Sequence, residues 1–192
     1  MKMEAPIVYL IGGPNGAGKT TFARQFLPAV GVMEFLNADS LAAGLAPLDP
    51  ASAGIRAGRL LLERWNELVA EKRSFAFEST LSGLTYATMI REAKAQGCRL
   101  HICYLHLATV QHSIRRVRER VKKGGHDVPR ADLQRRFLPS LRNFFQRYLP
   151  LADHAVLYDS TLQPPCLVAE WHQSSPRIAI PRLYERILTR LG

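Results

Sequence analysis

One stretch near the start of the chain carries residue types that bind phosphate groups. Residues 13–20 match the pattern G-x-x-x-x-G-K-[ST], with Lys19 and Thr20 as its last two members. Glycines permit positive φ, so that backbone N–H groups can gather around phosphate oxygens. Lys19 is expected to reach the β- and γ-phosphates of a nucleotide, and the Thr20 hydroxyl to bind Mg²⁺. The residues expected to hold ATP or GTP are Gly13, Pro14, Asn15, Gly16, Ala17, Gly18, Lys19, Thr20 and Thr21.

The context of this loop supports the same interpretation. A buried-strand pattern, residues 6–12, precedes it, and a helix pattern, residues 18–26, follows it. A helix that begins at the loop stabilises a bound anion through its dipole and its free N–H groups. These elements disfavour the competing interpretation, a glycine-rich turn that matches by chance. The chain lacks base-reading GTPase motifs and the length of ATPase motors, which favours a small-molecule kinase.

Asp39 follows the apolar run of residues 32–36, which predicts a short strand. A hydroxyl that accepts a phosphoryl group needs a carboxylate to orient it and take its proton, so Asp39 is the candidate general base. The structural alternative is that Asp39 caps the turn that follows. Position alone leaves both roles open.

Glu78 ends the apolar run of residues 74–77, which predicts a third strand. A carboxylate there can bind Mg²⁺ or its waters, or contact the acceptor. The alternative is an ion pair with Lys19 or with an arginine. Ser79 and Thr80 are candidate acceptor contacts, although turn residues commonly have the same composition.

The segment from Thr109 to Arg136 is densely basic. Phosphoryl transfer spreads negative charge over three equatorial oxygens, which arginines from a closing lid can stabilise. Most members of such a run are solvated, and we expect two or three of them to touch phosphate. Arg120 and Arg136 are the candidates, and Arg116 and Arg135 are neighbours that could exchange roles with them. Gly124, Gly125 and His126 suit a hinge between two helices.

Apolar runs alternate with helix patterns along the chain, which predicts a three-layer α/β fold with a mainly parallel, five-stranded sheet. Polar residues recur at the carboxyl ends of the predicted strands, where ligands bind in such folds. Pro139 is expected to kink or split the helix in which it lies. The expected strands are 6–12, 32–36, 74–77, 100–107 and 155–158, with a hairpin of 166–171 and 177–180 across Ser174, Ser175 and Pro176. The expected helices are 18–26, 50–71, 86–96, one that Thr109 caps, one from about 129, and 181–191.

Length and composition indicate one globular domain, residues 1–192, with a core of 6–160, a lid of about 122–136 and a C-terminal appendage of 161–192. The net charge is +10, which favours anionic partners, although it also suits a soluble basic surface. No CxxC pair, signal-peptide layout or bilayer-length apolar run is present, so we expect a reduced, soluble, cytoplasmic protein.

Other classes of site have weaker support. The six histidines show no metal-binding spacing and are expected to be structural or surface residues. Nucleic-acid binding would use the same basic segment, but the aromatic residues near it fall on an apolar stripe, whereas stacking platforms should be exposed. Those aromatic residues are Phe137, Phe144, Phe145 and Tyr148.

The ordered set of motifs resembles the zeta-toxin-like P-loop kinases over about residues 6–160. The motifs that carry the likeness are residues 12–21, 35–39, 75–83, 116–121 and 124–129, followed by 135–137, 140–143 and 158–160. The resemblance implies an adenylate-kinase-like core with a helical basic lid. It also implies phosphorylation of a UDP-N-acetylhexosamine hydroxyl that depends on ATP and Mg²⁺, and it allows an antitoxin partner.

The resemblance also implies roles for particular residues. Lys19 would hold phosphates and Thr20 the metal, while Asp39 would be the general base and Glu78 an acceptor contact. Lid arginines would stabilise the transferred group.

The leading hypothesis is therefore a kinase that acts on a nucleotide sugar or another small anionic acceptor. A second hypothesis is a different acceptor, such as a free sugar, a small acid or a polynucleotide end, which Arg56 and Arg59 could contact. A third is a nucleotide-gated binding module without turnover.

Overall fold

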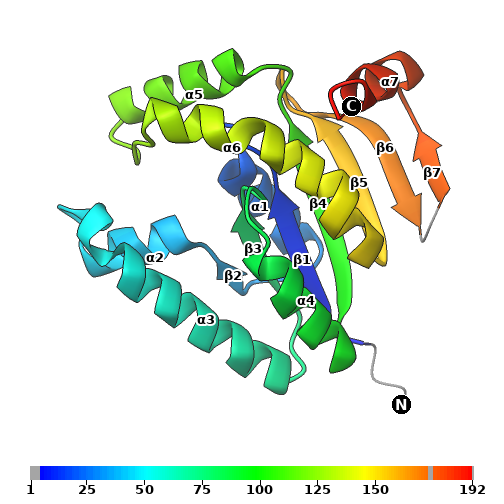
Figure 1. Cartoon of the computed structure of the whole chain (residues 1–192). Helices are drawn as coiled ribbons and strands as arrows, with labels where there is room; N and C mark the ends of the chain where they lie inside the picture. The colour runs from blue at the N-terminus through cyan, green and yellow to red at the C-terminus, as the bar shows by residue number, and fades with distance from the viewer. Residues whose placement is uncertain (1–4, 173–174, 192) are drawn as a thin grey trace.

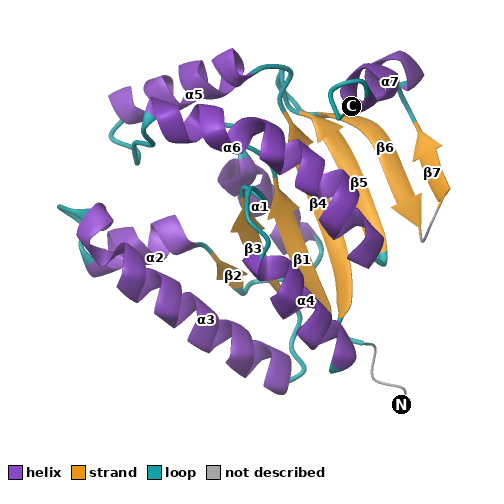
Figure 2. Cartoon of the chain, viewed as in Figure 1, coloured by secondary structure: helices purple, strands orange, loops and turns teal. Residues whose placement is uncertain are grey.

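The computed structural model describes residues 5–172 and 175–191, and within them seven strands form one sheet (Figures 1 and 2). Their order is β2-β3-β1-β4-β5-β6-β7. The pairings from β2 to β5 are parallel, and both pairings of β6 are antiparallel. The strands are β1 (Ile7–Gly12), β2 (Phe35–Leu36), β3 (Phe75–Ser79), β4 (Arg99–His106), β5 (His154–Asp159), β6 (Cys166–His172) and β7 (Ser175–Ile178).

The sheet confirms the predicted α/β class and its mainly parallel pairing, but the prediction of five strands is wrong. The C-terminal hairpin extends the sheet because β6 pairs with β5. Residues 160–165 alone connect these two strands, and a parallel neighbour needs a crossover of a dozen or more residues. The connection therefore permits only antiparallel pairing. Of the turn expected at Ser174, Ser175 and Pro176, the last two lie in β7, and Ser174 lies outside the described residues.

Helices pack on both faces of the sheet and form the outer two of three layers. One face carries α3, α4 and α6, with Trp65 and Phe77 in the shared core. The opposite face carries α1, which packs against Tyr9 and Ile11. Figure 1 shows α3, α4 and α6 in front of the sheet and α1 behind it. The helices are α1 (Lys19–Ala29), α2 (Ala38–Leu45), α3 (Gly54–Ala70), α4 (Thr85–Ala95), α5 (Val110–Lys122), α6 (Arg130–Asn143) and α7 (Pro181–Leu188), with short 3₁₀ or π turns at Pro50–Ala53, Phe144–Tyr148 and Leu149–Leu151.

The predicted helix stop and start signals are confirmed where a local cap sets them. The Thr109 side chain accepts a hydrogen bond from the backbone N–H of His112 and caps α5. Gly97 and Gly124 have positive φ just beyond the ends of α4 and α5. Among the described residues, no helix combines the length and the apolar character that crossing a bilayer requires.

The predicted split at Pro139 is wrong, because α6 continues through this residue to Asn143. An interior proline removes one backbone donor and costs about 3 kcal/mol. Leu141 and Phe144 lie in the buried core just after it and hold the helix on the sheet. Tertiary packing therefore outweighs the local preference. The helical geometry changes only later, at the π turn Phe144–Tyr148.

A buried hydrogen bond fixes α6 to the sheet. The Tyr104 hydroxyl of β4 lies 2.9 Å from the Ser140 hydroxyl, and both residues are almost completely buried. The Tyr104 ring also stacks on Phe144, with ring centroids 4.4 Å apart. This contact orients the helix that carries Arg136 toward the carboxyl edge of the strands.

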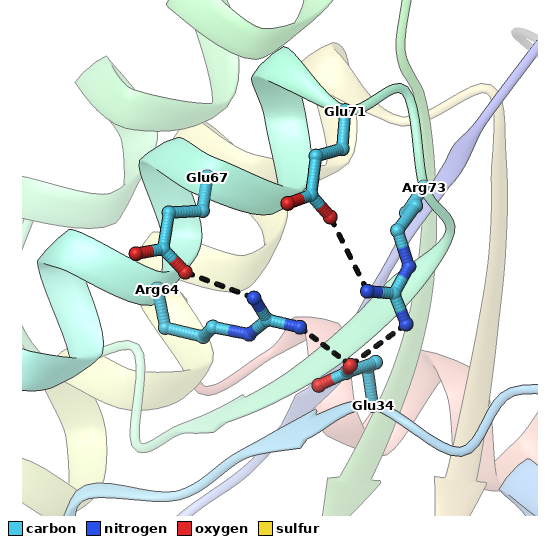
Figure 3. A network of polar contacts seen from close by, with 5 residues as sticks. All are labelled: Glu34, Arg64, Glu67, Glu71 and Arg73. Atoms are coloured by element: carbon cyan, nitrogen blue, oxygen red, sulfur yellow. Dashed lines mark hydrogen bonds and ion pairs between the residues drawn. The ribbon is translucent and has the colours of Figure 1, made fainter.

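An ion-pair network joins Glu34, the residue just before β2, to the C-terminal half of α3 and the segment that follows it (Figure 3). One carboxylate oxygen of Glu34 accepts hydrogen bonds from Arg64 at 2.6 Å and from Arg73 at 2.8 Å. Arg64 also pairs with Glu67, and Arg73 with Glu71. The network lowers the pKa of Glu34, mainly through its hydrogen bond with Arg64. It anchors the segment that leads through β2 to Asp39.

Substitution Tyr104→Phe should destabilise the protein by about 1–3 kcal/mol, because it leaves the buried Ser140 hydroxyl without its partner. Chemical denaturation measures the change in the free energy of unfolding. The double variant Tyr104→Phe, Ser140→Ala is the control, since removal of both partners should restore part of that loss. A double variant less stable than the single one by the full cost of Ser140→Ala alone would contradict this account.

Candidate functional site

The predicted phosphate loop lies between β1 and α1, and its glycines meet two needs, close backbone packing and positive φ. Gly13 has a φ of +141°, and a side chain there would place its Cβ 2.4 Å from the carbonyl oxygen of Leu105. Gly18, in the left-handed region, is the N-cap of α1. No side chain in the described part of the chain caps that helix, so its first N–H groups are available to an anion.

Hydrogen bonds from α5 and from the end of β5 hold the outer side of this loop. The Ser113 hydroxyl donates to the carbonyl oxygen of Asn15 at 2.6 Å, and the Ser160 hydroxyl donates to that of Ala17 at 2.7 Å. Arg116 donates to the carbonyl oxygens of Gly16 and Thr161, at 3.4 and 3.1 Å. Arg116 is therefore committed to supporting the loop.

Lys19 is buried at the first position of α1, with 7% of its surface exposed. Its Nζ donates a hydrogen bond to the carbonyl oxygen of Pro14 at 3.2 Å. Burial lowers the pKa of Lys19, while the charges of Glu78 and Asp39 raise it and that of Arg120 lowers it further. A buried ammonium under these opposing charges would gain from an anion in the loop.

Thr20 and Glu78 form a pair of oxygen donors beside the loop. The Thr20 hydroxyl donates to Oε2 of Glu78 at 2.7 Å. Glu78 is placed there by the parallel pairing of β1 and β3, which sets it opposite Ile11. Magnesium takes hard oxygen ligands at 2.0–2.1 Å in an octahedron, whose adjacent ligands are about 2.9 Å apart. The donor types and their spacing therefore fit Mg²⁺. The alternative role for Glu78, an ion pair, does not occur among the described residues.

Asp39 lies in the first turn of α2, a helix that the sequence analysis does not predict. The cap of that helix is Asn37, whose Oδ1 accepts the backbone N–H of Ser40 at 2.9 Å. The alternative role of Asp39 as an N-cap is therefore excluded. Its carboxylate is exposed on the wall of the same cleft that holds Lys19.

The two candidate arginines have different environments. In the part of the chain that the structure describes, Nε and one terminal nitrogen of Arg120 are buried without any hydrogen-bond partner. Gly125 packs over its aliphatic stem, and a Cβ at Gly125 would lie 2.5 Å from Cγ of Arg120. Arg136 also lines the cleft, but one nitrogen lies 3.4 Å from a carboxylate oxygen of Asp132. Arg120 thus has N–H groups without partners among the described residues, and an anion could accept hydrogen bonds from them.

The remaining members of the basic segment are less suited to the site. Arg135 is 68% exposed at its side chain and pairs with Asp132 at 2.6 Å. Gly124 and Gly125 donate backbone hydrogen bonds to Val121 and Arg120, so the expected hinge is a hydrogen-bonded turn that ends α5.

The loop after β3 has a constrained backbone. Leu81 is buried with a φ of +58°, in the left-handed region that a branched side chain rarely adopts. Asn143 donates to the carbonyl oxygen of Leu81, and Tyr148 to that of Gly83, both at 2.8 Å. Ser79 and Thr80 line the cleft at the start of this loop, and their hydroxyls also make bonds within the turn.

These residues share one cleft of about 910 Å³ at the carboxyl edge of the strands. Of the residues predicted to hold the nucleotide, Gly13 and Pro14 belong to the phosphate loop but do not line the cleft. The predicted residues that line the cleft are Asn15, Gly16, Ala17, Gly18, Lys19, Thr20, Thr21, Asp39, Glu78, Ser79, Thr80, Arg116, Arg120 and Arg136.

Several other residues that line the cleft were not predicted from the sequence. Gln163 and Pro165 follow β5, so the rule that ligands bind at the carboxyl ends of strands was the available signal. Others reach the cleft from helix faces and carried no signal, namely Phe22, Gln25, Tyr86 and Glu119, whereas Lys123 belongs to the predicted basic segment. Arg56 and Arg59 are exposed on α3 and lie outside the described lining.

Comparison with known sequences identifies a family. Residues 8–137 match the family model AAA_33, described as an AAA domain. An uncharacterised protein of Haemophilus influenzae is 32% identical over 116 residues, which are 60% of this chain and 81% of that protein.

Similar folds occur among solved structures. The complex of AvrRxo1-ORF1 and AvrRxo1-ORF2 with ATP has a TM-score of 0.77 at 18% identity, covering 97% of this chain and 64% of that one. This chain thus spans less than two thirds of that relative. The PezAT toxin–antitoxin system of Streptococcus pneumoniae has a TM-score of 0.67 at 16% sequence identity, and the match covers 96% of this chain and 78% of that chain. A gluconokinase from Sinorhizobium meliloti has a TM-score of 0.54 at 18% sequence identity, and the match covers 98% of this chain and 93% of that chain.

The solved structures share the fold alone at these identities, and they include a kinase. The family model covers more than half of the sequence and includes the phosphate loop, Asp39, Glu78 and both candidate arginines. The chain therefore belongs to the AAA_33 family of P-loop domains and has a P-loop kinase-like fold.

Proposed function

We propose that this protein is a kinase that transfers the γ-phosphoryl group of ATP to a hydroxyl of a small anionic acceptor. The observation that carries the proposal is that four charged residues converge beside the phosphate loop: Lys19, Asp39, Glu78 and Arg120. All four line one cleft with the phosphate loop. A phosphate-binding cation, a candidate base and an unpaired guanidinium are thus close enough to serve one transferred group.

The residues divide the work of phosphoryl transfer. The loop N–H groups and Lys19 bind the β- and γ-phosphates. Asp39 takes the proton of the acceptor hydroxyl as its oxygen bonds to the γ-phosphorus and the bond to the bridging oxygen breaks, which leaves ADP. Arg120 and Arg136 stabilise charge on the transferred group. Mg²⁺, held by Thr20 and Glu78, would neutralise charge on the β- and γ-oxygens.

For the acceptor we propose a UDP-N-acetylhexosamine, as in the zeta-toxin-like kinases that the motifs resemble. The cleft of about 910 Å³ is at the upper end of the range for small-ligand sites, so it offers room beyond one nucleotide. Arg56 and Arg59 lie outside the described lining of the cleft, which disfavours acceptors that those two residues would have to contact. Phe144 and Tyr148 are buried, which leaves them unsuited to stack nucleic-acid bases.

We also propose an antitoxin-like protein partner and a cytoplasmic location. Two of the similar folds belong to systems with two protein components, AvrRxo1-ORF1 with AvrRxo1-ORF2 and the PezAT toxin–antitoxin pair. ATP and nucleotide sugars are cytoplasmic metabolites, which suits the proposed reaction. Co-purification of a protein encoded beside this one would test the partner.

The full reaction is tested by incubating the protein with Mg²⁺ and ATP labelled at the γ-phosphate, over panels of nucleotide sugars, free sugars, small acids and oligonucleotide ends. We expect an acceptor-dependent phosphorylated product from the nucleotide-sugar panel. Product from another panel would replace the acceptor but keep the kinase. Tight ATP binding without product from any panel would contradict the kinase and favour a nucleotide-gated binding module.

Substitution Asp39→Asn should lower kcat by about 10²-fold or more, because the amide cannot take the acceptor proton. The affinity for Mg²⁺-ATP, measured by calorimetry, should change little. Asp49→Asn, at an exposed residue of the turn after α2, is the matched control and should keep full turnover. Unchanged turnover in Asp39→Asn would remove this residue from the base role.

Substitution Arg120→Ala should lower kcat/KM by about 10²-fold or more, because charge on the transferred group loses its guanidinium. The Tm of the ligand-free protein should stay the same or rise, since the substitution removes two buried nitrogens that have no hydrogen-bond partner among the described residues. Arg118→Ala, on the exposed face of the same helix, is the control. A large fall in Tm together with normal turnover would show that Arg120 is purely structural.

A further inference from the structure

A second cluster of chemically active side chains lies on β5 and β6, at the opposite end of these strands from the cleft. His154 begins β5, and the antiparallel register sets it directly opposite His172 of β6. Glu170 precedes His172 by two positions on the same strand, and side chains two apart point to the same face. The pairing of β5 and β6 therefore brings two imidazoles and one carboxylate together on one face.

That face is the one that carries α1. His154 is level with His101 on β4, which is level with Tyr9 on β1. Tyr9 packs against Phe26 of α1, so the whole row shares the α1 side. Within the described residues the side chain of His172 is 71% exposed, while those of His154 and Glu170 are 25% and 24% exposed. The cluster is thus half-buried and open to solvent on one side.

The donor atoms already converge. Nε2 of His154 lies 2.9 Å from Oε1 of Glu170, and Nε2 of His172 lies 3.1 Å from the same oxygen. One donor atom from each residue lies within 4.8 Å of the other two. With bonds of about 2.0–2.1 Å, the ligands of a tetrahedral zinc ion are about 3.3 Å apart. A small movement of the side chains would meet that geometry.

We propose that His154, Glu170 and His172 form a three-ligand site for Zn²⁺. Two imidazoles and a carboxylate are a donor set that zinc prefers, and the exposed side leaves the fourth position to water. Binding replaces the hydrogen bond of His154 and the ion-pair contact of His172 to Glu170 with three metal–ligand bonds. Each ring then carries a single proton on Nδ1, and a proton on Nε2 moves to Nδ1 or is released to solvent. This site is separate from the cleft and does not depend on the proposed kinase activity.

The neighbours of the cluster favour a fixed geometry. The ring of His101 packs edge-on against that of His154, with centroids 5.2 Å apart, and the rings of His154 and His172 stack at 4.5 Å. Packing that limits ring rotation lowers the entropy lost when the metal binds. Zinc would then link β6, and with it β7 and α7, to the parallel part of the sheet.

Zinc binding can be tested on the full chain without any nucleotide. The protein is first treated with a chelator and then titrated with ZnCl₂ by calorimetry, with a thermal unfolding scan in parallel. We expect one equivalent bound at micromolar concentration or below and a rise in Tm that grows with free zinc. With Co²⁺ in place of Zn²⁺, the visible absorption of a tetrahedral site should develop.

Variants distinguish this site from other zinc-binding groups. His172→Gln changes an exposed side chain and Glu170→Gln is nearly isosteric, so both should fold, and each should weaken binding by about tenfold or more. His126→Gln, at an exposed histidine after α5, is the matched control and should leave binding unchanged. Absence of binding at about 100 μM Zn²⁺, or equal binding by the His172→Gln variant, would overturn the proposal.

Discussion

Two cations that line one cleft, the buried Lys19 and the partly buried Arg120, dominate the electrostatics of this structure. Lys19 is buried, two nitrogens of Arg120 are buried as well, and the charge of Arg120 lowers the pKa of Lys19. Glu78 and Asp39 offset part of that repulsion. An anion in the loop would remove most of what is left, so the ligand-free protein is poised for a polyphosphate. The fold holds these charges in place through elements far apart in sequence.

The sheet provides that placement. β1 ends at the phosphate loop, and its parallel neighbour β3 carries Glu78 near its own end, so the carboxylate meets the Thr20 hydroxyl although 58 residues separate the two along the chain. β2 leads into α2 and Asp39 on the far side of β3, and the Glu34 network anchors that path. Arg120 and Arg136 approach from α5 and α6 instead. Base and guanidinium therefore reach the cleft from opposite walls.

Much of the site could be predicted from sequence because its determinants are local. The phosphate loop, its strand and its helix are contiguous, and Thr109 and Gly97 mark helix ends through their own chemistry. Features that depend on residues far away in the sequence could not be predicted in this way. Separating Arg116 from Arg120 required knowing which carbonyl groups lie nearby, and the unbroken helix at Pro139 depends on packing against the core. The seven-stranded sheet depends on an edge that only the folded β5 provides.

The histidines illustrate the same limit. His154 and His172 have no spacing along the chain that is typical of metal sites, so from the sequence they are expected to be structural or surface residues without a metal. The antiparallel register makes them direct neighbours. A pairing between strands is a long-range property, and spacing along one strand does not reveal it.

The bonds on the outer side of the phosphate loop have a kinetic consequence. The carbonyl groups of Pro14, Asn15, Gly16 and Ala17 all accept hydrogen bonds from the protein itself. With its acceptors already occupied, the loop is preorganised, and a nucleotide would not have to order it on arrival. Association should then be limited by diffusion and electrostatic attraction, while differences in affinity between nucleotides should emerge in their dissociation rates.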